Sequence, residues 1–327
     1  MLHINRIAIV LAFIVVVLGA YTRLSDAGLG CPDWPGCYGK AIVPETQAKI
    51  DPANPTYATR PLEPAKAWKE MVHRYAAGTL GTLILVIAIL AWRKRKQPGQ
   101  PLAIPLLLVG LVIFQALLGM WTVTLLLKPI IVMGHLFGGM TILALLTWIY
   151  LSNSHGTIAI RAQPHPLRIW AALGLLIVAV QISLGGWTGA NYAALICPDL
   201  PLCQGQWWPP MDFSEGFIPW RGLGVNYEFG VLEGPARTAV HMSHRLGAVI
   251  TLLVIAGIAI RAILDPVPRI KRAGVILLLV LLSQFSLGVA NILLSLPIAV
   301  AVTHNGVAAL LLLSILALLF HTRYSTA

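Results

Sequence analysis

Charged residues are scarce in this sequence of 327 residues. Asp, Glu, Lys and Arg together make up only 11% of the chain, whereas 57% of the residues are hydrophobic and the mean hydropathy is +0.80. A water-soluble protein of this length has no core large enough for so many apolar side chains, so the composition excludes a soluble globular domain. We therefore expect a protein that lies in a lipid bilayer.

Acidic residues are the scarcer of the two charged kinds, with 12 Asp and Glu against 23 Lys and Arg and a formal net charge of +11. The basic residues gather in short loops between apolar segments, at residues 93–96, 161–168 and 261–272. Lys and Arg beside membrane spans are retained on the cytoplasmic side, so we expect these loops and both termini in the cytoplasm. Anionic lipid headgroups then account for the positive charge, and we expect no nucleic acid partner.

Polar interruptions are few, and eight apolar segments are long enough to cross a membrane. About 20 helical residues span the roughly 30 Å of hydrocarbon in a bilayer. The segments lie near residues 7–23, 70–92, 102–124, 129–151, 169–190, 238–261, 273–294 and 297–320. The first segment has a poor cleavage pattern of small residues behind it, so we interpret it as a membrane anchor and not as a signal peptide. The sequence thus predicts an all-α, multi-pass protein of the bacterial inner (cytoplasmic) membrane.

An internal repeat divides the chain into two halves. Each half has four apolar segments, a long loop expected outside the membrane, a pair of cysteines and a His-Arg dipeptide at the start of its second segment. Four crossings return the chain to the same side, so the halves should be parallel repeats about an axis along the membrane normal. We predict two tandem, pseudo-twofold-related four-helix bundles, residues 1–151 and 169–327, joined by a cytoplasmic linker at 152–168.

Cysteine is limited to four residues, which form two pairs with equal spacing in the expected outer loops. Cys31 and Cys37 lie in CPDWPGC, and Cys197 and Cys203 lie in CPDLPLC. An oxidising compartment outside the membrane favours one disulfide within each pair. A metal site built from both pairs is the alternative, but the pairs belong to different halves and no histidine accompanies them at zinc-ligand spacing.

Four histidines lie near the outer ends of the second and fourth segments of each half. They are His73, His135, His244 and His304. A single membrane histidine is often a packing residue, but two pairs at matched depth are what haem iron between two imidazoles requires. Small residues follow most of these histidines at three and four positions, where a flat macrocycle would lie against the helix: Ala76, Ala77, Gly138, Gly139, Gly247, Ala248 and Ala308, with Val307 as the exception. The pattern favours two haem sites.

Polar neighbours of these histidines differ between the halves. Arg74 and Arg245 directly follow a histidine, and they either pair with haem propionates or extend to the membrane interface. Glu70 stands three residues before His73, where His241 stands in the second half. Glu70 is either a solvated carboxylate or a group beside the macrocycle that moves a proton or stabilises positive charge. His241 is an alternative ligand, a proton donor or a surface residue.

Five motifs together resemble the haem A synthase family over nearly the whole chain. They are TRLSDAGLGCPDWPGC at 22–37, EMVHR at 70–74, GH at 134–135, HMSHR at 241–245 and THN at 303–305. The resemblance implies a haem-dependent membrane oxidoreductase that oxidises one methyl group of haem O to a formyl group, giving haem A for cytochrome oxidases. It implies that His73, His135 and Glu70 handle the substrate haem O, and that His244 and His304 hold a haem b cofactor. A redox role for Cys31 and Cys37 stays open beside a structural one.

Partners follow from the same resemblance, and other classes of function compete with it. We expect haem O synthase and the assembly of cytochrome oxidase as protein partners, and a homo-oligomer is compatible with the sequence. A di-haem b-type electron-transfer subunit would need the same four histidines, but it has no use for an acid beside only one haem. A transporter with alternating access would need helices broken near the midplane, whereas prolines here gather at segment ends and in loops.

Overall fold

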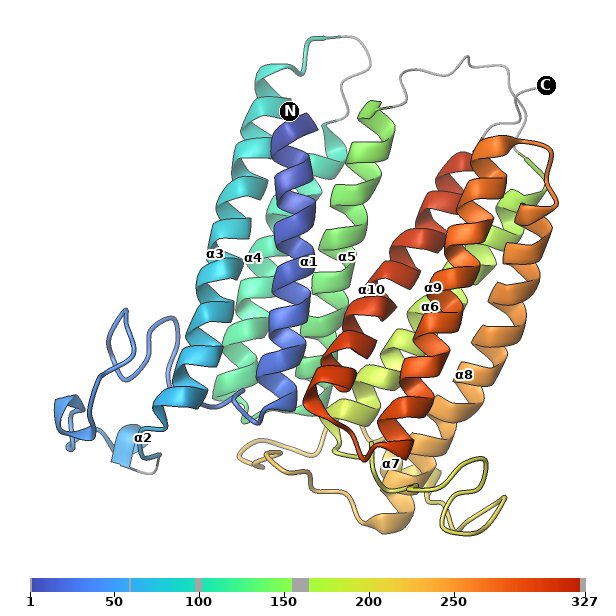
Figure 1. Cartoon of the computed structure of the whole chain (residues 1–327). Helices are drawn as coiled ribbons and strands as arrows, with labels where there is room; N and C mark the ends of the chain where they lie inside the picture. The colour runs from blue at the N-terminus through green and yellow to red at the C-terminus, as the bar shows by residue number, and fades with distance from the viewer. Residues whose placement is uncertain (1, 59, 98–101, 155–164, 324–327) are drawn as a thin grey trace.

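The computed structural model of the chain describes residues 2–58, 60–97, 102–154 and 165–323. Within these residues the fold is all-α, and no strand is formed (Figure 1). The eight long helices are α1 (Leu2–Leu24), α3 (Pro64–Arg93), α4 (Ala103–Thr124), α5 (Pro129–Ser154), α6 (Leu167–Ala190), α8 (Gly234–Ile263), α9 (Pro268–Leu293) and α10 (Ile298–His321). The loops contain the short helices α2 (Pro55–Ala58) and α7 (Phe213–Gly216) and a 3-10 turn at Gln47–Lys49.

All eight long helices are long and apolar enough to cross a membrane, which confirms the eight predicted spans. The starts of four helices were predicted too late, because α1 begins at Leu2, α3 at Pro64, α8 at Gly234 and α9 at Pro268, and the last three have a proline at the first or second helical position. Proline lacks the N–H that the first helical turn leaves unpaired, and its fixed φ suits that turn. Each of these helices therefore gains more than a turn of mixed polarity, and His73 and His244 lie about three turns inside their helices.

Helix packing follows the two halves of the sequence. In the first half α1 and α4 each pack against both α3 and α5, and in the second half α8 and α10 each pack against both α6 and α9. The halves meet where α10 packs against α1 and α5, and where α5 packs against α6 (Figure 1). The pseudo-twofold relation between tandem bundles stays a prediction. Most of the predicted linker at 152–168 lies outside the described residues.

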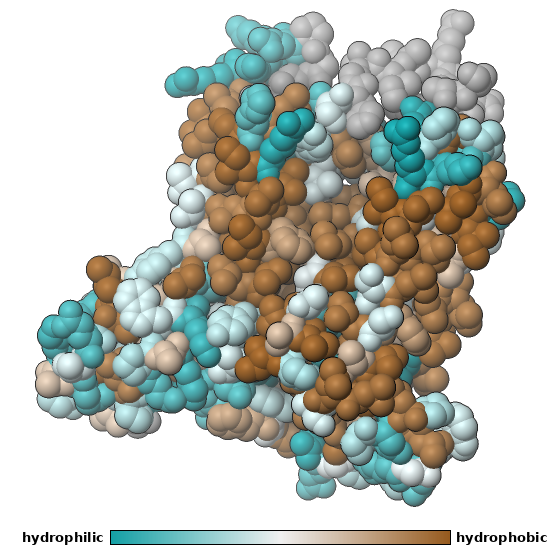
Figure 2. Space-filling model, in the orientation of Figure 1, coloured by the Kyte–Doolittle hydropathy of each residue, from teal (hydrophilic) through white to brown (hydrophobic). Residues whose placement is uncertain are grey.

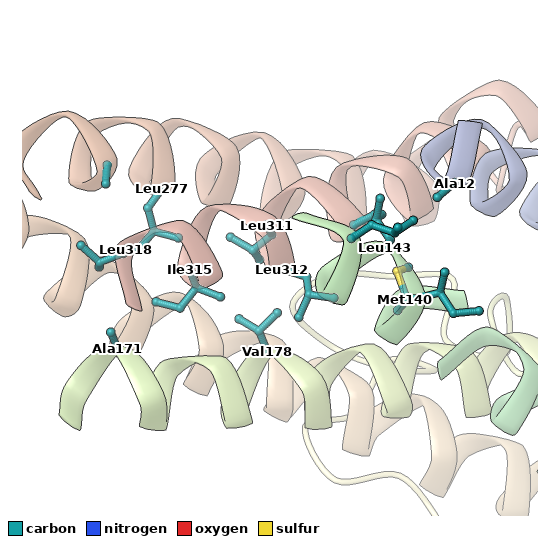
Figure 3. Close-up of a cluster of buried hydrophobic side chains, with 14 of the residues drawn as sticks. Ala12, Met140, Leu143, Ala171, Val178, Leu277, Leu311, Leu312, Ile315 and Leu318 are labelled. Atoms are coloured by element: carbon teal, nitrogen blue, oxygen red, sulfur yellow. The ribbon is translucent and has the colours of Figure 1, made fainter. Parts of the chain in front are cut away.

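The largest cluster of buried apolar side chains draws on both halves (Figure 3). Met140 and Leu143 of α5 lie close to Leu312 of α10, and the cluster continues to Val178 of α6. Leu143 has no exposed surface, and Val178 is 1% exposed. One continuous core therefore packs the eight long helices together. It fixes the positions of the four helices that carry the predicted ligand histidines, α3, α5, α8 and α10, relative to each other.

The face of the molecule seen in Figure 2 has an apolar band across the middle of the helices and polar residues towards both ends. Large apolar side chains such as Ile7 and Leu253 are 58% and 69% exposed, as expected for residues that face lipid. The start of α1, the end of α10 and the α8–α9 turn lie at one end, and the long loops lie at the other (Figure 1).

Both predicted disulfides are present, Cys31–Cys37 with a Cα–Cα distance of 4.9 Å and Cys197–Cys203 with 4.6 Å. No cysteine is free, so a metal site built from both pairs is excluded in this structure. The two loops have the same internal bonds. Asp33 accepts hydrogen bonds from the N–H groups of residues 38 and 39, and Asp199 accepts them from residues 204 and 205. The two loops therefore share the same disulfide spacing and the same aspartate hydrogen bonds, which supports the internal repeat.

Candidate functional site

Each of the four predicted ligand histidines packs against a glycine of the preceding span. A Cβ atom placed on the glycine would lie 3.0 to 3.2 Å from the Cε1 atom of the imidazole, inside the usual carbon–carbon contact of about 3.5 Å. The pairs are Gly19 with His73, Gly119 with His135, Gly185 with His244, and Gly288 with His304. The glycines therefore let each imidazole approach the neighbouring backbone, which gives the repeated Leu-Gly dipeptides of the sequence a structural reason.

His73 and His135 face each other across the interior of the first half. Their ring centroids are 6.3 Å apart, and the ring planes cross at 78°. Two imidazoles on opposite sides of one iron, each with a metal–nitrogen bond of about 2 Å, hold their ring centres about 6 Å apart. The structure therefore brings this predicted pair together at a separation that fits haem ligation.

His244 of α8 and His304 of α10 occupy the corresponding positions in the second half. Each packs edge-on against its own glycine as the first pair does. Four-helix bundles commonly hold cofactors with side chains from facing helices, so the second pair offers the same kind of site.

Three glutamines that the sequence analysis missed surround these histidines. Gln115 donates to the backbone carbonyl of His135 at 2.5 Å, and Gln181 donates to that of His244 at 3.0 Å. Gln284 lies 3.3 Å from Nε2 of His304. A signal was available in the sequence, because each glutamine stands four residues before the glycine that packs against the imidazole.

Two of the small residues that follow the histidines, Gly138 and Gly247, do not have the expected role of making room for a flat macrocycle. A Cβ atom on Gly138 would collide with the side chain of Gln115, and one on Gly247 would collide with that of Gln181. These glycines therefore make room for a glutamine of the neighbouring helix and not for a flat macrocycle.

Glu70 is buried, with 5% of its surface exposed, which excludes a solvated carboxylate. Its Oε2 accepts a hydrogen bond from the backbone N–H of Cys31 at 2.9 Å, and its Oε1 forms an ion pair with Arg74. Residues three apart on a helix share a face, so Glu70 lies on the same side of α3 as His73. The carboxylate thus joins the first disulfide loop to the helix that carries a predicted ligand.

Arg74 and Arg245 hold the two disulfide loops. Arg74 donates to the carbonyl oxygens of Asp33 and Gly36, at 2.9 and 2.6 Å. Arg245 donates to three carbonyls of the second loop, those of Cys197, Asp199 and Leu202, at 2.7 to 2.9 Å. The predicted contact of these arginines with haem propionates stays a prediction.

His241 is 4% exposed, so it is not a surface residue. Its Nδ1 lies 2.9 Å from the carbonyl oxygen of Ala193, and its Nε2 accepts from Nε of Arg245 at 2.8 Å. Both ring nitrogens are therefore occupied, which leaves none for iron in this arrangement. His241 supports its arginine as Glu70 supports Arg74, and only the first half has a carboxylate at this position.

These features define a class, a multi-pass helical membrane protein with a pair of imidazoles facing each other inside its first half and two histidines at the corresponding positions of its second half. The model of the family described as cytochrome oxidase assembly protein matches residues 4–316. A heme A synthase of Shewanella oneidensis is 43% identical over 326 residues, which cover 98% of this chain and 97% of the relative. Heme A synthases of Halalkalibacterium halodurans and Caulobacter vibrioides are 27% and 28% identical over 91% and 92% of this chain, and 89% and 90% of the relatives.

The chain therefore belongs to the family of cytochrome oxidase assembly proteins that includes these haem A synthases. This membership confirms the resemblance found in the sequence motifs. It also makes the chain a member of a family of membrane oxidoreductases that act on haem.

Proposed function

We propose that this chain is a haem A synthase, which oxidises a methyl group of haem O to a formyl group and so gives haem A for cytochrome oxidases. The observation that carries the proposal is the His73–His135 pair, 6.3 Å between ring centroids, with the buried carboxylate of Glu70 on the same helix. The 43% identical relative over nearly the whole chain supports the same reaction.

The first half, residues 1–151, is proposed as the substrate domain, in which His73 and His135 hold haem O. The second half, residues 169–327, is proposed as the cofactor domain, in which His244 and His304 hold haem b. The difference between Glu70 and His241 supports this division, because an acid near the substrate is useful and an acid near a cofactor that only transfers electrons is not.

Haem b, when bound, supplies one-electron transfer. The residues of the chain supply the rest. His73 and His135 would hold the macrocycle on the side of α3 that carries Glu70. The Oε atoms of Glu70 are then available to accept a proton from the substrate or to stabilise positive charge on the oxidised carbon. Its bonds to Arg74 and to the N–H of Cys31 hold the carboxylate in one place until then.

The end of the molecule that has the α3–α4 and α8–α9 turns is proposed to face the cytoplasm. Basic residues gather there, including Arg93, Lys94, Arg261 and Lys271. The disulfide loops then lie outside the inner membrane, in a compartment that allows disulfides to persist. Arg74 and Arg245 are placed at that outer boundary, where haem propionates prefer to remain near water.

The proposed partners follow from the chemistry of substrate and product. An enzyme that makes haem O must deliver this poorly soluble substrate, and the assembly of cytochrome oxidase must take up the product, so haem O synthase and oxidase assembly proteins are expected neighbours in the membrane. Oligomerisation of the chain stays a prediction.

Expression in a host that makes haem O but no haem A tests this function. The extracted pigments should contain haem A with the wild-type chain, and should lack it with Glu70→Gln, because the amide keeps the shape of the side chain but cannot take up the proton. Glu63→Gln is the matched control, since Glu63 pairs with Lys66 in an exposed position at the start of α3. Wild-type yield of haem A from Glu70→Gln would show that Glu70 is not the catalytic residue.

A further inference from the structure

A segment of the second half lies against the first half at the end of the molecule that has the long loops. Residues 220–230 stand between α7 and α8, and we call them the crossing segment. The loop between these helices runs beneath the first half in the view of Figure 1. The backbone N–H of Tyr227 donates to the carbonyl oxygen of Leu126, in the turn between α4 and α5, at 3.0 Å. The halves are therefore joined through this loop as well as through their helices.

The crossing segment also surrounds the side chain of Lys128, in the same turn. The ammonium group of Lys128 donates to the carbonyl oxygen of Gly222 and lies 3.4 Å from the ring centroid of Trp220. A cation is attracted to the face of an aromatic ring, and a buried ammonium group without partners is costly. These contacts therefore hold the crossing segment on the turn.

The corresponding turn of the second half, between α9 and α10, is less covered. Leu127 and Lys128 of the α4–α5 turn are 5% and 1% exposed. Leu296 and Pro297 stand at the same distances before the predicted ligand histidine of their half, and both are partly exposed. The nearby Leu294 is 59% exposed. The covering of one half by a loop of the other is therefore one-sided.

Two neighbouring residues of the crossing segment act on Leu29. The side chain of Tyr227 packs in one buried apolar cluster with Leu29 and residues near the end of α4. Glu228 forms an ion pair with Arg60, with 2.9 Å between Oε2 and Nη2. The other terminal nitrogen of Arg60, Nη1, donates to the carbonyl oxygen of Leu29 at 3.2 Å. Contacts that start in the second half thus reach both the side chain and the backbone of Leu29.

Leu29 begins the short stretch that supplies a hydrogen bond to Glu70. A Cβ atom placed on Gly30 would lie 2.8 Å from the carbonyl oxygen of Lys66, so residues 29–31 run directly against the first turn of α3. The backbone N–H of Cys31 donates to Oε2 of Glu70 at 2.9 Å. The place of this donor depends on where residues 29–31 lie against the helix.

We propose that the second half completes the site of the first, with Glu228 and Arg60 as positioning residues for Glu70. They keep residues 29–31 in place, and with them the N–H group that fixes the carboxylate. The proposal rests on the proposed function, because it takes Glu70 as the acid of the substrate site. It also explains why the covering is one-sided, since the second half has His241 in place of Glu70 and no acid to position.

Removal of one charge tests the proposal. Glu228→Gln keeps the shape of the side chain but leaves Arg60 without its charged partner, and hydrogen bonds between charged groups are about twice as strong as neutral ones. Glu45→Gln is the matched control, because Glu45 pairs with Lys49 in an exposed part of the first long loop. Arg60→Gln, alone and combined with Glu228→Gln, tests whether the two residues act along one path.

Two measurements use the full-length chain, produced in a host that makes haem O but no haem A. Hydrogen exchange of the amides at residues 29–31, which needs no haem, should become about 10-fold faster in Glu228→Gln, because a hydrogen bond to a charged group adds that much protection. The ratio of haem A to haem O in the extracted pigments should also fall about 10-fold, since a distant mutation that misplaces a reacting group costs up to about 100-fold. Total haem should stay at the wild-type level, and Glu45→Gln should match the wild type in all three readouts.

The combined variant should have the same pigment ratio as Arg60→Gln alone, because residues that act along one path do not give additive effects. An unchanged pigment ratio in Glu228→Gln would overturn the proposal, whether or not exchange at residues 29–31 becomes faster. Fully additive losses in the combined variant would overturn it as well. A wild-type chain that yields haem O but no haem A would instead overturn the proposed function, while hydrogen exchange still reports the contact between the halves.

Discussion

The contact between Gly185 and His244 gives the sharpest prediction from the fold. Gly185→Ala adds a methyl group whose carbon would lie 3.0 Å from Cε1 of the imidazole, so the ring must move by roughly 0.5 Å to regain a normal contact. Overpacking of this kind costs about 1–3 kcal/mol, and the better helix propensity of alanine returns up to about 1 kcal/mol. The net loss of folding stability is therefore small, about 0–2 kcal/mol.

The effect on a bound haem should be much larger than the effect on folding. Functional side chains need to be held within about 0.5 Å of their working geometry, so the displaced imidazole should ligate iron poorly. We expect the affinity of the second half for haem to fall at least about 10-fold. Mutations that disturb the orientation of a metal ligand typically lower metal affinity by about 10–100-fold. The assay is the haem content of the purified chain by pyridine haemochrome, together with its low-spin spectrum.

Gly189→Ala is the matched control, because it lies one turn further along α6 and a Cβ atom there meets nothing within 4 Å. This variant should keep its haem and its thermal stability. Full haem content and an unchanged low-spin spectrum in Gly185→Ala would refute the reasoning that the glycine positions the ligand.

Two further predictions concern the second disulfide loop. Backbone N–H groups of Gly205 and Gln204 hold the pKa of Asp199 below its usual range. A carboxylate whose pKa is lower in the folded loop than in the unfolded loop stabilises the folded loop fully when the pH is above the unfolded-state pKa of about 3.9. This stabilisation is lost as the pH falls through the pKa of the carboxylate in the folded loop. Hydrogen-exchange protection of these two amides should therefore drop below about pH 4 in the wild type and be independent of pH in Asp199→Asn, and a pH-independent wild type would contradict this. Cys197→Ser with Cys203→Ser should cost about 2 kcal/mol of loop stability, measured by proteolysis of the loop, and equal cleavage rates with and without the disulfide would contradict it.

Much of the fold could be predicted from the sequence because its signals are long or repeated. A stretch of 20 apolar residues has no other stable place than a bilayer, and all eight spans were recognised on that ground. The Cys31–Cys37 and Cys197–Cys203 pairs were recognised because equal spacing in both halves makes a local bond the simplest explanation. The early starts of α3 and α8 were missed, since their first turns are too polar to be recognised by hydropathy.

The surroundings of the histidines were predicted less completely. The depth of each histidine follows from its position along a span, but the neighbour of its ring depends on how two helices are rotated against each other. Gly138 was interpreted as room for a flat ligand, whereas it accommodates Gln115. His241 was left with three roles, and only the bonds to Ala193 and Arg245 show that it supports the second disulfide loop.

The central claim is that each half of the chain holds one haem between two imidazoles. Electron paramagnetic resonance and pigment analysis of the full-length chain, purified from a host that makes haem O, test it most directly. The account predicts low-spin, bis-imidazole haem in the wild type, loss of the haem O signal in His135→Ala, and loss of the haem b signal in His304→Ala. Retention of both low-spin signals in either variant would contradict it.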